Sequence, residues 1–217
     1  GIDAKIEAAG ISVTVTDTIT AAEQVTLDGL TAGLITATIS DTSDTQLTNI
    51  ANRAAGDHNL TITLDDASVS SAALITLESK TSGLVTVNTS ELTGSTGNVS
   101  TVLGLNNGTG RITGLSSTPI TLNAGATTAI ADANTINGLT SGAITATITE
   151  DTIGALGGLQ GTGNNYTITV ATPSVSANAL NALNAKTTGV ITVGSTTITG
   201  FLSDIKAAYD ANTAGEL

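Results

Sequence analysis

The chain has 217 residues, of which 40% are hydrophobic and only 1% aromatic, and its formal net charge is −12. This acidic balance excludes nucleic acid and anionic membrane surfaces as partners, because both require a basic surface. Without cysteine the chain forms no disulfide and no thiolate metal site, and no stretch approaches the roughly 20 apolar residues of a membrane-spanning helix.

One pattern recurs four times along the chain and is centred on a Thr-x-Gly triplet. Apolar residues precede each triplet, and an alternating stretch of threonine and aliphatic residues follows it. The triplets are Thr31-Ala32-Gly33, Thr81-Ser82-Gly83, Thr140-Ser141-Gly142 and Thr187-Thr188-Gly189. An internal period of this size is the signature of a repeat architecture.

Each repeat is predicted to contain two strands, because polar residues alternate with β-branched apolar residues in both. The first strand precedes a helical run, and the second follows the Thr-x-Gly triplet. First strands are expected at 12–16, 61–64, 120–123 and 167–170. The inward side chains are expected to form one aliphatic column: Val13, Val15, Ile35, Ile62, Leu64, Val85, Val87, Ile120, Leu122, Ile144, Ile168, Val170, Ile191 and Val193.

Helical spacing fills the intervals between the strands. Ser70 and Ser176 are expected to be N-caps, and the glycines of the triplets are expected to be helix C-caps. The second connections also place apolar residues three apart, which predicts further short helices. These pairs are Leu47 with Ile50, Val99 with Val102, Ile153 with Leu156, and Leu202 with Ile205.

The predicted fold is an α/β repeat solenoid with a parallel sheet, in which each coil of about 25 residues supplies one strand and one short helix. An all-β right-handed parallel β-helix is the alternative. The chain is expected to form a single solenoid of about four double-coil repeats, at 11–59, 60–118, 119–165 and 166–217, with 1–10 as the end of a preceding repeat. The ends lack polar caps, which suggests a longer array or stacking on neighbouring molecules.

The stretch Leu180–Ile191, with Ile198-Thr199-Gly200 and then 204–209, resembles repeats of very large bacterial surface and secreted proteins, especially cyanobacterial ones. The first and third copies depart from that pattern, with Asp28-Gly29-Leu30 and Asn137-Gly138-Leu139 in place of the Ala-Lys step. The resemblance implies an extracellular structural or adhesive role and no catalytic residues.

Few residues are candidates for chemistry. His58 is the only histidine and is expected in an exposed turn, since a catalytic triad or zinc site needs further partners. Carboxylates near the strand ends are calcium candidates, although N-capping accounts for them equally: Asp41, Asp44, Asp65, Asp66 and Asp151. Glycosidase activity is not expected, because it needs two carboxylates that face each other across a cleft. Phosphate loops are not expected either, because the glycine-rich stretches lack a following Lys-Ser/Thr.

The outward strand positions are rich in threonine, and a simple alignment of the strands gives ranks of Thr-x-Thr. Such ranks resemble the ice-binding faces of β-solenoid antifreeze proteins, whereas threonine is also the preferred uncharged residue on an exposed strand. The ranks comprise Thr14, Thr16, Thr36, Thr38, Thr61, Thr63, Thr145, Thr147, Thr167 and Thr169.

The leading prediction is a non-enzymatic structural repeat protein of a bacterial cell surface, filament or surface layer. It requires no cofactor and associates with itself end to end or laterally. The alternative is a binding module, such as an adhesin, whose threonine ranks face ice or a cell-surface glycan.

Overall fold

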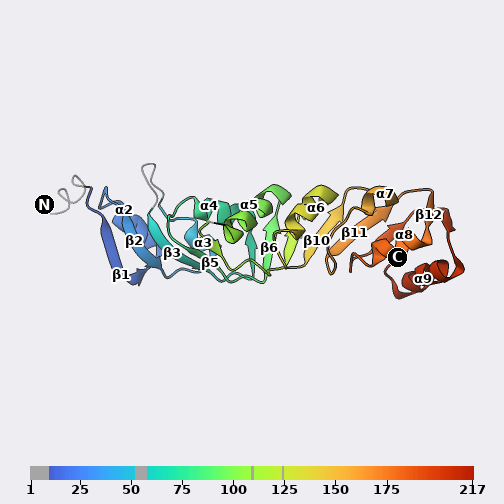
Figure 1. The fold of residues 1–217 in the computed structure, drawn as a ribbon. Coiled ribbons are helices and arrows are strands. Elements are labelled where there is room, and N and C mark those ends of the chain that lie inside the picture. Colours follow the sequence, from blue (N-terminus) through green and yellow to red (C-terminus); the bar gives the residue numbers. More distant parts are fainter. Residues whose placement is uncertain (1–9, 52–57, 109, 124) are drawn as a thin grey trace. The chain divides into compact units, whose positions relative to one another are not determined.

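A computed structural model gives the fold of residues 10–51, 58–108, 110–123 and 125–217. Helices follow single strands or runs of two or three strands in these ranges, and every strand pair described in them is parallel (Figure 1). The protein is therefore an α/β protein with parallel sheets, as predicted, and the helices rule out the all-β alternative. No helix of the described ranges has the length and apolar character needed to cross a membrane.

The chain divides into two compact units. Unit 1 comprises Gly1–Leu92 and Thr101–Thr118, and unit 2 comprises Thr93–Ser100 and Pro119–Leu217. Strand β6 (Glu91–Gly94) and helix α5 (Thr96–Asn107) contain residues of both. The four repeats proposed from the sequence remain a prediction, and of the predicted segment 1–10 only Gly10 lies within the described residues.

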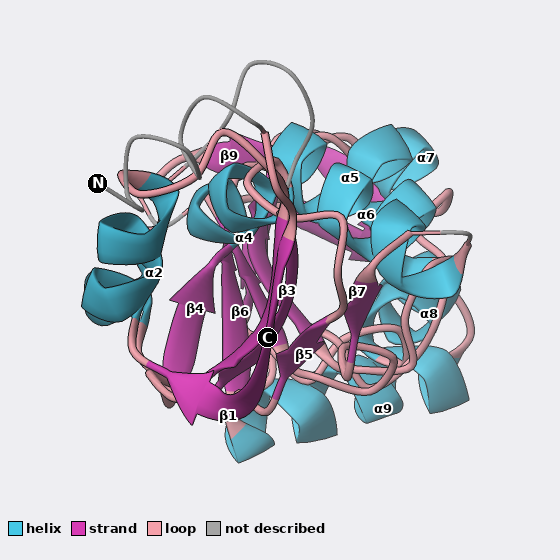
Figure 2. Ribbon diagram, turned by 90° about the vertical axis from the view of Figure 1, so that its left-hand side faces the viewer, coloured by secondary structure: helices cyan, strands magenta, loops and turns pink. Residues whose placement is uncertain are grey.

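Unit 1 contains a five-stranded parallel sheet in the order β1-β2-β3-β5-β7. The strands and helices of unit 1 are β1 (Val13–Ile19), α2 (Ala21–Asp28), β2 (Ile35–Ile39), α3 (Asp44–Leu47), β3 (Asn59–Leu64), β4 (Ser68–Ser70), α4 (Ser71–Glu78), β5 (Val85–Val87) and β7 (Ile112–Thr113). In Figure 2, β3, β5 and β7 follow one another, and α2 and α4 lie outside the strands. We call each strand, with the helix and loop that lead to the next strand, a segment.

Unit 2 repeats this arrangement, with neighbouring strands β8, β10, β11 and β13. Two shorter ladders join β9 to β10 and β12 to β14. The elements are β8 (Ile120–Leu122), β9 (Thr127–Thr128), α6 (Ile130–Asn137), β10 (Ile144–Ile148), α7 (Ile153–Leu156), β11 (Asn165–Val170), β12 (Ser174–Ser176), α8 (Ala177–Asn184), β13 (Ile191–Val193), β14 (Thr197–Thr199) and α9 (Leu202–Ala214).

All eight predicted strands and the helices between them are confirmed, and so are the predicted N-caps Ser70 and Ser176, whereas the C-caps differ from prediction. Ser176 caps α8, since its hydroxyl accepts the Ala179 N–H, and Ser70 is the N-cap of α4 without a side-chain bond. Thr20 and Glu23 form a capping box at α2, and the hydrogen bonds from Thr20 lower the pKa of Glu23. The short strands β4, β6, β7, β9, β12 and β14 were not predicted from the sequence.

The predicted aliphatic column is confirmed in the interior of each sheet. Ile35, Ile62 and Ile144 are fully buried. Val13, Val15 and Val193 are only half-buried, because β1 and β13 are edge strands among the described residues and lack an apolar neighbour on one side.

Candidate functional site: threonine face and segment junctions

The outward side of the strands carries the predicted threonines. None of the ten is buried, and Thr36, Thr63 and Thr145 are half-buried while the other seven are exposed. They lie on β1, β2 and β3 in unit 1 and on β10 and β11 in unit 2. These ten threonines give the outward side of the strands in each unit a set of hydroxyl and methyl groups, which we call the threonine face.

The strand register differs from the simple ranks expected from the sequence. Thr38 lies beside Thr61 instead of Thr63, and Thr36 lies beside Asn59. We call a row of side chains at paired positions of neighbouring strands a file. Because Ile62 pairs with Val85, Leu84 lies beside Thr61 and interrupts this file of threonines.

Unit 2 shows the same offset of two residues. Thr147 lies beside Thr167 instead of Thr169, and Thr127 lies on its other side. Since Ile168 pairs with Ile191, the next position in this file is Val190. The file in unit 1 thus comprises Thr18, Thr38 and Thr61 before Leu84, and the file in unit 2 comprises Thr127, Thr147 and Thr167 before Val190.

A buried polar side chain accepts the first strand N–H of the offset pair in each unit. The Ile35 N–H donates to Nδ1 of His58 at 3.0 Å, and the Ile144 N–H donates to Oδ1 of Asn164 at 2.9 Å. A parallel ladder would ordinarily supply a backbone carbonyl at this point. The side chain replaces that carbonyl and allows the strand to begin in a shifted register.

The prediction that His58 lies in an exposed turn is wrong. Its side chain is fully buried, with Nε2 at 2.9 Å from Oδ1 of Asp28. Because Nδ1 accepts the Ile35 N–H, Nε2 carries the proton and donates it to Asp28. The turn-like composition around His58 was misleading, since it says nothing of what packs over the side chain.

Equivalent polar pairs recur at the ends of four helices. The last residue of α2, α4 and α6 contacts the residue that precedes a strand of a later segment, and the last residue of α8 contacts Glu216, which follows α9. The pairs are Asp28 with His58 at 2.9 Å, Glu78 with Arg111 at 2.6 Å, Asn137 with Asn164 at 3.0 Å, and Asn184 with Glu216 at 2.7 Å. The same position therefore tolerates an ion pair, a histidine–carboxylate pair and an amide pair.

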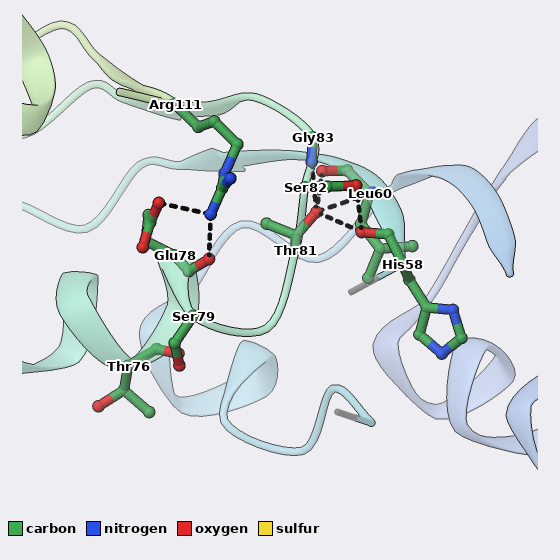
Figure 3. Close-up of polar contacts among 9 residues, drawn as sticks. All are labelled: His58, Leu60, Thr76, Glu78, Ser79, Thr81, Ser82, Gly83 and Arg111. Carbon is green, nitrogen blue, oxygen red and sulfur yellow. Dashed lines mark hydrogen bonds and ion pairs between the residues drawn. The ribbon is translucent and has the colours of Figure 1, made fainter. Parts of the chain in front are cut away.

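The Thr-x-Gly triplet forms the junction between neighbouring segments (Figure 3). The buried hydroxyl of Thr81 accepts the N–H groups of Gly83 at 2.9 Å and Leu60 at 2.8 Å. It lies 3.0 Å from the His58 carbonyl and 2.9 Å from the Leu60 carbonyl, and donates its proton there. One side chain thus satisfies backbone groups of two segments.

Thr187 makes the same contacts in unit 2. Its hydroxyl accepts the Gly189 and Tyr166 N–H groups and faces the Asn164 and Tyr166 carbonyls. Thr31 likewise accepts the Gly33 N–H and donates to the Ile11 carbonyl. The threonine of the triplet is therefore a structural hydrogen-bonding centre.

The glycine of the triplet is required by close approach of the backbone, which corrects its predicted role as a helix C-cap. A Cβ at Gly83 would overlap the Leu60 carbonyl, with the carbonyl carbon 2.6 Å away, and one at Gly189 would lie 2.7 Å from that of Tyr166. The C-caps are instead earlier in the chain, at Ser79 and Ala185.

Most of the calcium candidates bind backbone or amide groups of a neighbouring segment. Asp41 accepts the Ala21 N–H at the start of α2 at 2.7 Å, and Asp66 accepts the Asp44 N–H at the start of α3 at 2.6 Å. Asp65 accepts the Asn88 amide at 2.9 Å. The carboxylates are thus distributed over several helix ends.

The Asp151 carbonyl accepts the Ala171 N–H, so this residue too is bonded to a neighbouring segment. Within the described ranges no three His, Cys, Asp or Glu side chains gather as a metal ion would need. The calcium prediction is tested directly by melting the protein with calcium and with a chelator. If calcium binds, the melting temperature should be higher with calcium than with the chelator.

The core of unit 2 contains a tyrosine where unit 1 has Leu60. Tyr166 is fully buried, and its hydroxyl has no hydrogen-bond partner among the described residues. Burial raises the pKa of Tyr166 from 10.0 to about 12.

Tyr166→Phe is expected to stabilise unit 2 by about 1 kcal/mol, because an unpaired buried hydroxyl costs roughly 1–3 kcal/mol. The unfolded phenol ionises first, so the parent should lose stability between pH 10 and pH 12, and Tyr166→Phe should remove that loss. Denaturant titrations at several pH values measure both effects. Tyr209→Phe, at an exposed position, is the control and should change neither quantity.

Unit 2 supplies the matched control for His58, because Asn164 occupies the equivalent position. His58→Asn preserves an acceptor for the Ile35 N–H and is expected to cost less than about 1 kcal/mol. His58→Leu removes the acceptor of that N–H and the hydrogen bond from Nε2 to Asp28, and is expected to cost about 2–4 kcal/mol. Equal losses of unfolding free energy in the two variants would show that the acceptor has no structural role.

The sequence contained a signal for these junction residues. His58 precedes Thr81 by 23 residues (81 − 58), and Asn164 precedes Thr187 by the same interval (187 − 164).

Comparison of the chain with protein-family models, curated proteins and solved structures gives no match in any of the three.

Proposed function

We propose that this chain is a non-enzymatic structural repeat protein of a bacterial cell surface, an extracellular filament or a surface layer. In this proposal the segments are coils of one solenoid, and the protein assembles with further copies through stacked coils. The observation that carries it is the junction, in which the hydroxyl groups of Thr31, Thr81 and Thr187 donate to the Ile11, His58 and Asn164 carbonyls of the preceding segments.

The spacing of paired residues supports the solenoid. Ile62 pairs with Val85, and Ile168 pairs with Ile191, so both partners are 23 residues apart (85 − 62; 191 − 168). Other parallel partners are between 20 residues (165 − 145) and 27 residues (112 − 85) apart, which is the range expected of stacked coils of about 25 residues. Caps that cross between segments, such as Asp41 at the start of α2, also favour a continuous stack.

The chemistry of the polar residues supports a role without catalysis. His58 holds a backbone N–H and a carboxylate, and Asp41 and Asp66 hold helix ends. These groups stabilise the fold. The uncharged threonine face and the resemblance to bacterial surface repeats support an extracellular location.

Electron microscopy of the protein over a range of concentrations tests this proposal. Filaments, lattices or lengthening rods are the expected result, with sedimentation velocity as an independent measure of assembly. A protein that remains strictly monomeric at high concentration would contradict the proposal. Degradation of a polysaccharide by the purified protein would contradict its non-enzymatic part.

A second candidate is a binding face for ice or a cell-surface glycan, and the observation in its favour is the set of threonine files. Thr147 lies between Thr127 and Thr167 in one such file. Thermal hysteresis in the parent that is lost in Thr147→Tyr would support ice binding. The matched control is Thr26→Tyr, because Thr26 is an exposed residue of helix α2 and its replacement leaves the threonine face unaltered.

A further inference from the structure

The proposed function leaves open which surfaces join two copies. Resting on that function, we propose that strand β1 of one copy adds in parallel to the open edge of β13 of another. The contact is head to tail, and each copy uses one edge as donor and the other as acceptor. The second copy continues the parallel ladder that already runs through each unit.

The open edge of β13 lies beside an incompletely filled apolar core. Val193 is half-buried, whereas Val170, its partner on β11, is fully buried. Val190 is 54% exposed. A cavity of about 420 Å³ lies between these residues and α9, lined among others by Leu180, Ile198 and Tyr209.

The hydrogen bonds at β13 are oriented for a further parallel strand. Val190 and Gly194 bond to β11 through the Val190 carbonyl and the Gly194 N–H. Because alternate peptides of a strand face opposite sides, Ile191 and Val193 direct theirs to the open side. The Ile191 N–H already donates there to the Glu216 carbonyl at 3.0 Å, so a parallel neighbour fits at the next positions, beside Val193.

Strand β1 also has an edge with outward peptide groups and half-buried apolar side chains. The Val13 N–H donates to the carbonyl of Leu34, which precedes β2. The Thr14 peptide groups therefore face the side of β1 that lies away from β2. Val13 and Val15 are half-buried, whereas Ile35 beside Val13 is fully buried. The alternation of valine and threonine in β1 is that of the inner strand β5.

The two edges carry charges of both signs near the contact. Asp17 follows the uncharged stretch 12–16 in β1, and α9 beside β13 carries Asp204 and the ion pair of Lys206 with Asp210. The pairing therefore rests on the peptide groups that β1 and β13 direct outward, which a parallel neighbour joins in one continuous ladder. Parallel addition of β1 covers Val193 with the valines of β1, and their side chains continue the aliphatic column over the cavity.

Cysteine cross-linking tests the contact, because the chain has no cysteine of its own. If Val15 lies over Val193, Thr14 lies beside Thr192; if Val13 lies over Val193, Ser12 lies beside Thr192. Neighbouring strands are close enough for a disulfide in either register. Thr192→Cys protein is therefore mixed with Thr14→Cys or Ser12→Cys protein under mild oxidation.

A mixed disulfide in one of these two combinations is the expected result, at least about tenfold above that formed by Thr63→Cys, which lies on the inner strand β3, with Thr192→Cys. Assembly of the mixed proteins without either mixed disulfide would overturn the edge pairing and leave the proposed function standing. Absence of any assembly in the parent would overturn both. A second variant, Val193→Lys, should weaken assembly because a lysine on an edge opposes strand addition.

Discussion

Gly83→Ala is expected to destabilise unit 1 by roughly 3 kcal/mol, the upper part of the range for overpacking of a buried site. The added methyl group would overlap the Leu60 carbonyl, which is backbone and cannot rotate away as a side chain could. Strands β3 and β5 would have to separate, and their ladder from Ile62 to Leu64 would weaken. Denaturant unfolding of the parent and the variant measures the loss.

Gly104→Ala provides the control in the same unit. Gly104 lies within helix α5, and a Cβ there meets nothing within 4 Å. Alanine is favoured over glycine in a helix interior by about 1 kcal/mol, so this variant should be more stable than the parent. If the two variants changed stability in the same direction, close approach at Gly83 would not explain the triplet.

The strands and helices could be predicted because each has a local pattern. Alternation of polar and apolar residues identified β3 and β11, and the spacing of Leu180 and Leu183 identified α8. Inward and outward positions followed from that alternation, because a strand of period two admits only two assignments. The interior aliphatic column and the outward threonines are consequences of the same pattern.

The register and the role of the triplet depend on contacts across about 20 residues of chain, and a local pattern does not contain them. Asn59 and Thr61 both occupy outward positions, and contacts between segments, such as the bond from Ile35 to His58, accompany the register that places Asn59 beside Thr36. Glycine after a helix suggests a C-cap, whereas the constraint on Gly83 comes from another strand. A polar residue such as His58 carries no sign of burial in its own neighbourhood.

Thr81→Val is expected to destabilise unit 1 by about 2–5 kcal/mol, because each buried group left unpaired costs roughly 1–3 kcal/mol. Valine has nearly the same shape as threonine, so packing is preserved and the effect isolates the hydroxyl. Without it, the buried N–H groups of Leu60 and Gly83 lose their acceptor. The His58 and Leu60 carbonyls lose a donor in addition. Denaturant unfolding of the variant and the parent measures the loss.

Two further variants separate the hydroxyl from other causes. Thr81→Ser retains the oxygen and should cost about 1 kcal/mol, the loss of one buried methyl group. Thr61→Val changes an exposed residue of the threonine face and should alter stability by less than about 0.5 kcal/mol. A Thr81→Val protein as stable as Thr61→Val would contradict the role of the hydroxyl. The double variant Thr81→Val with Gly83→Ala should lose less than the sum of the single losses, because both changes open the same junction and its energy can be lost only once.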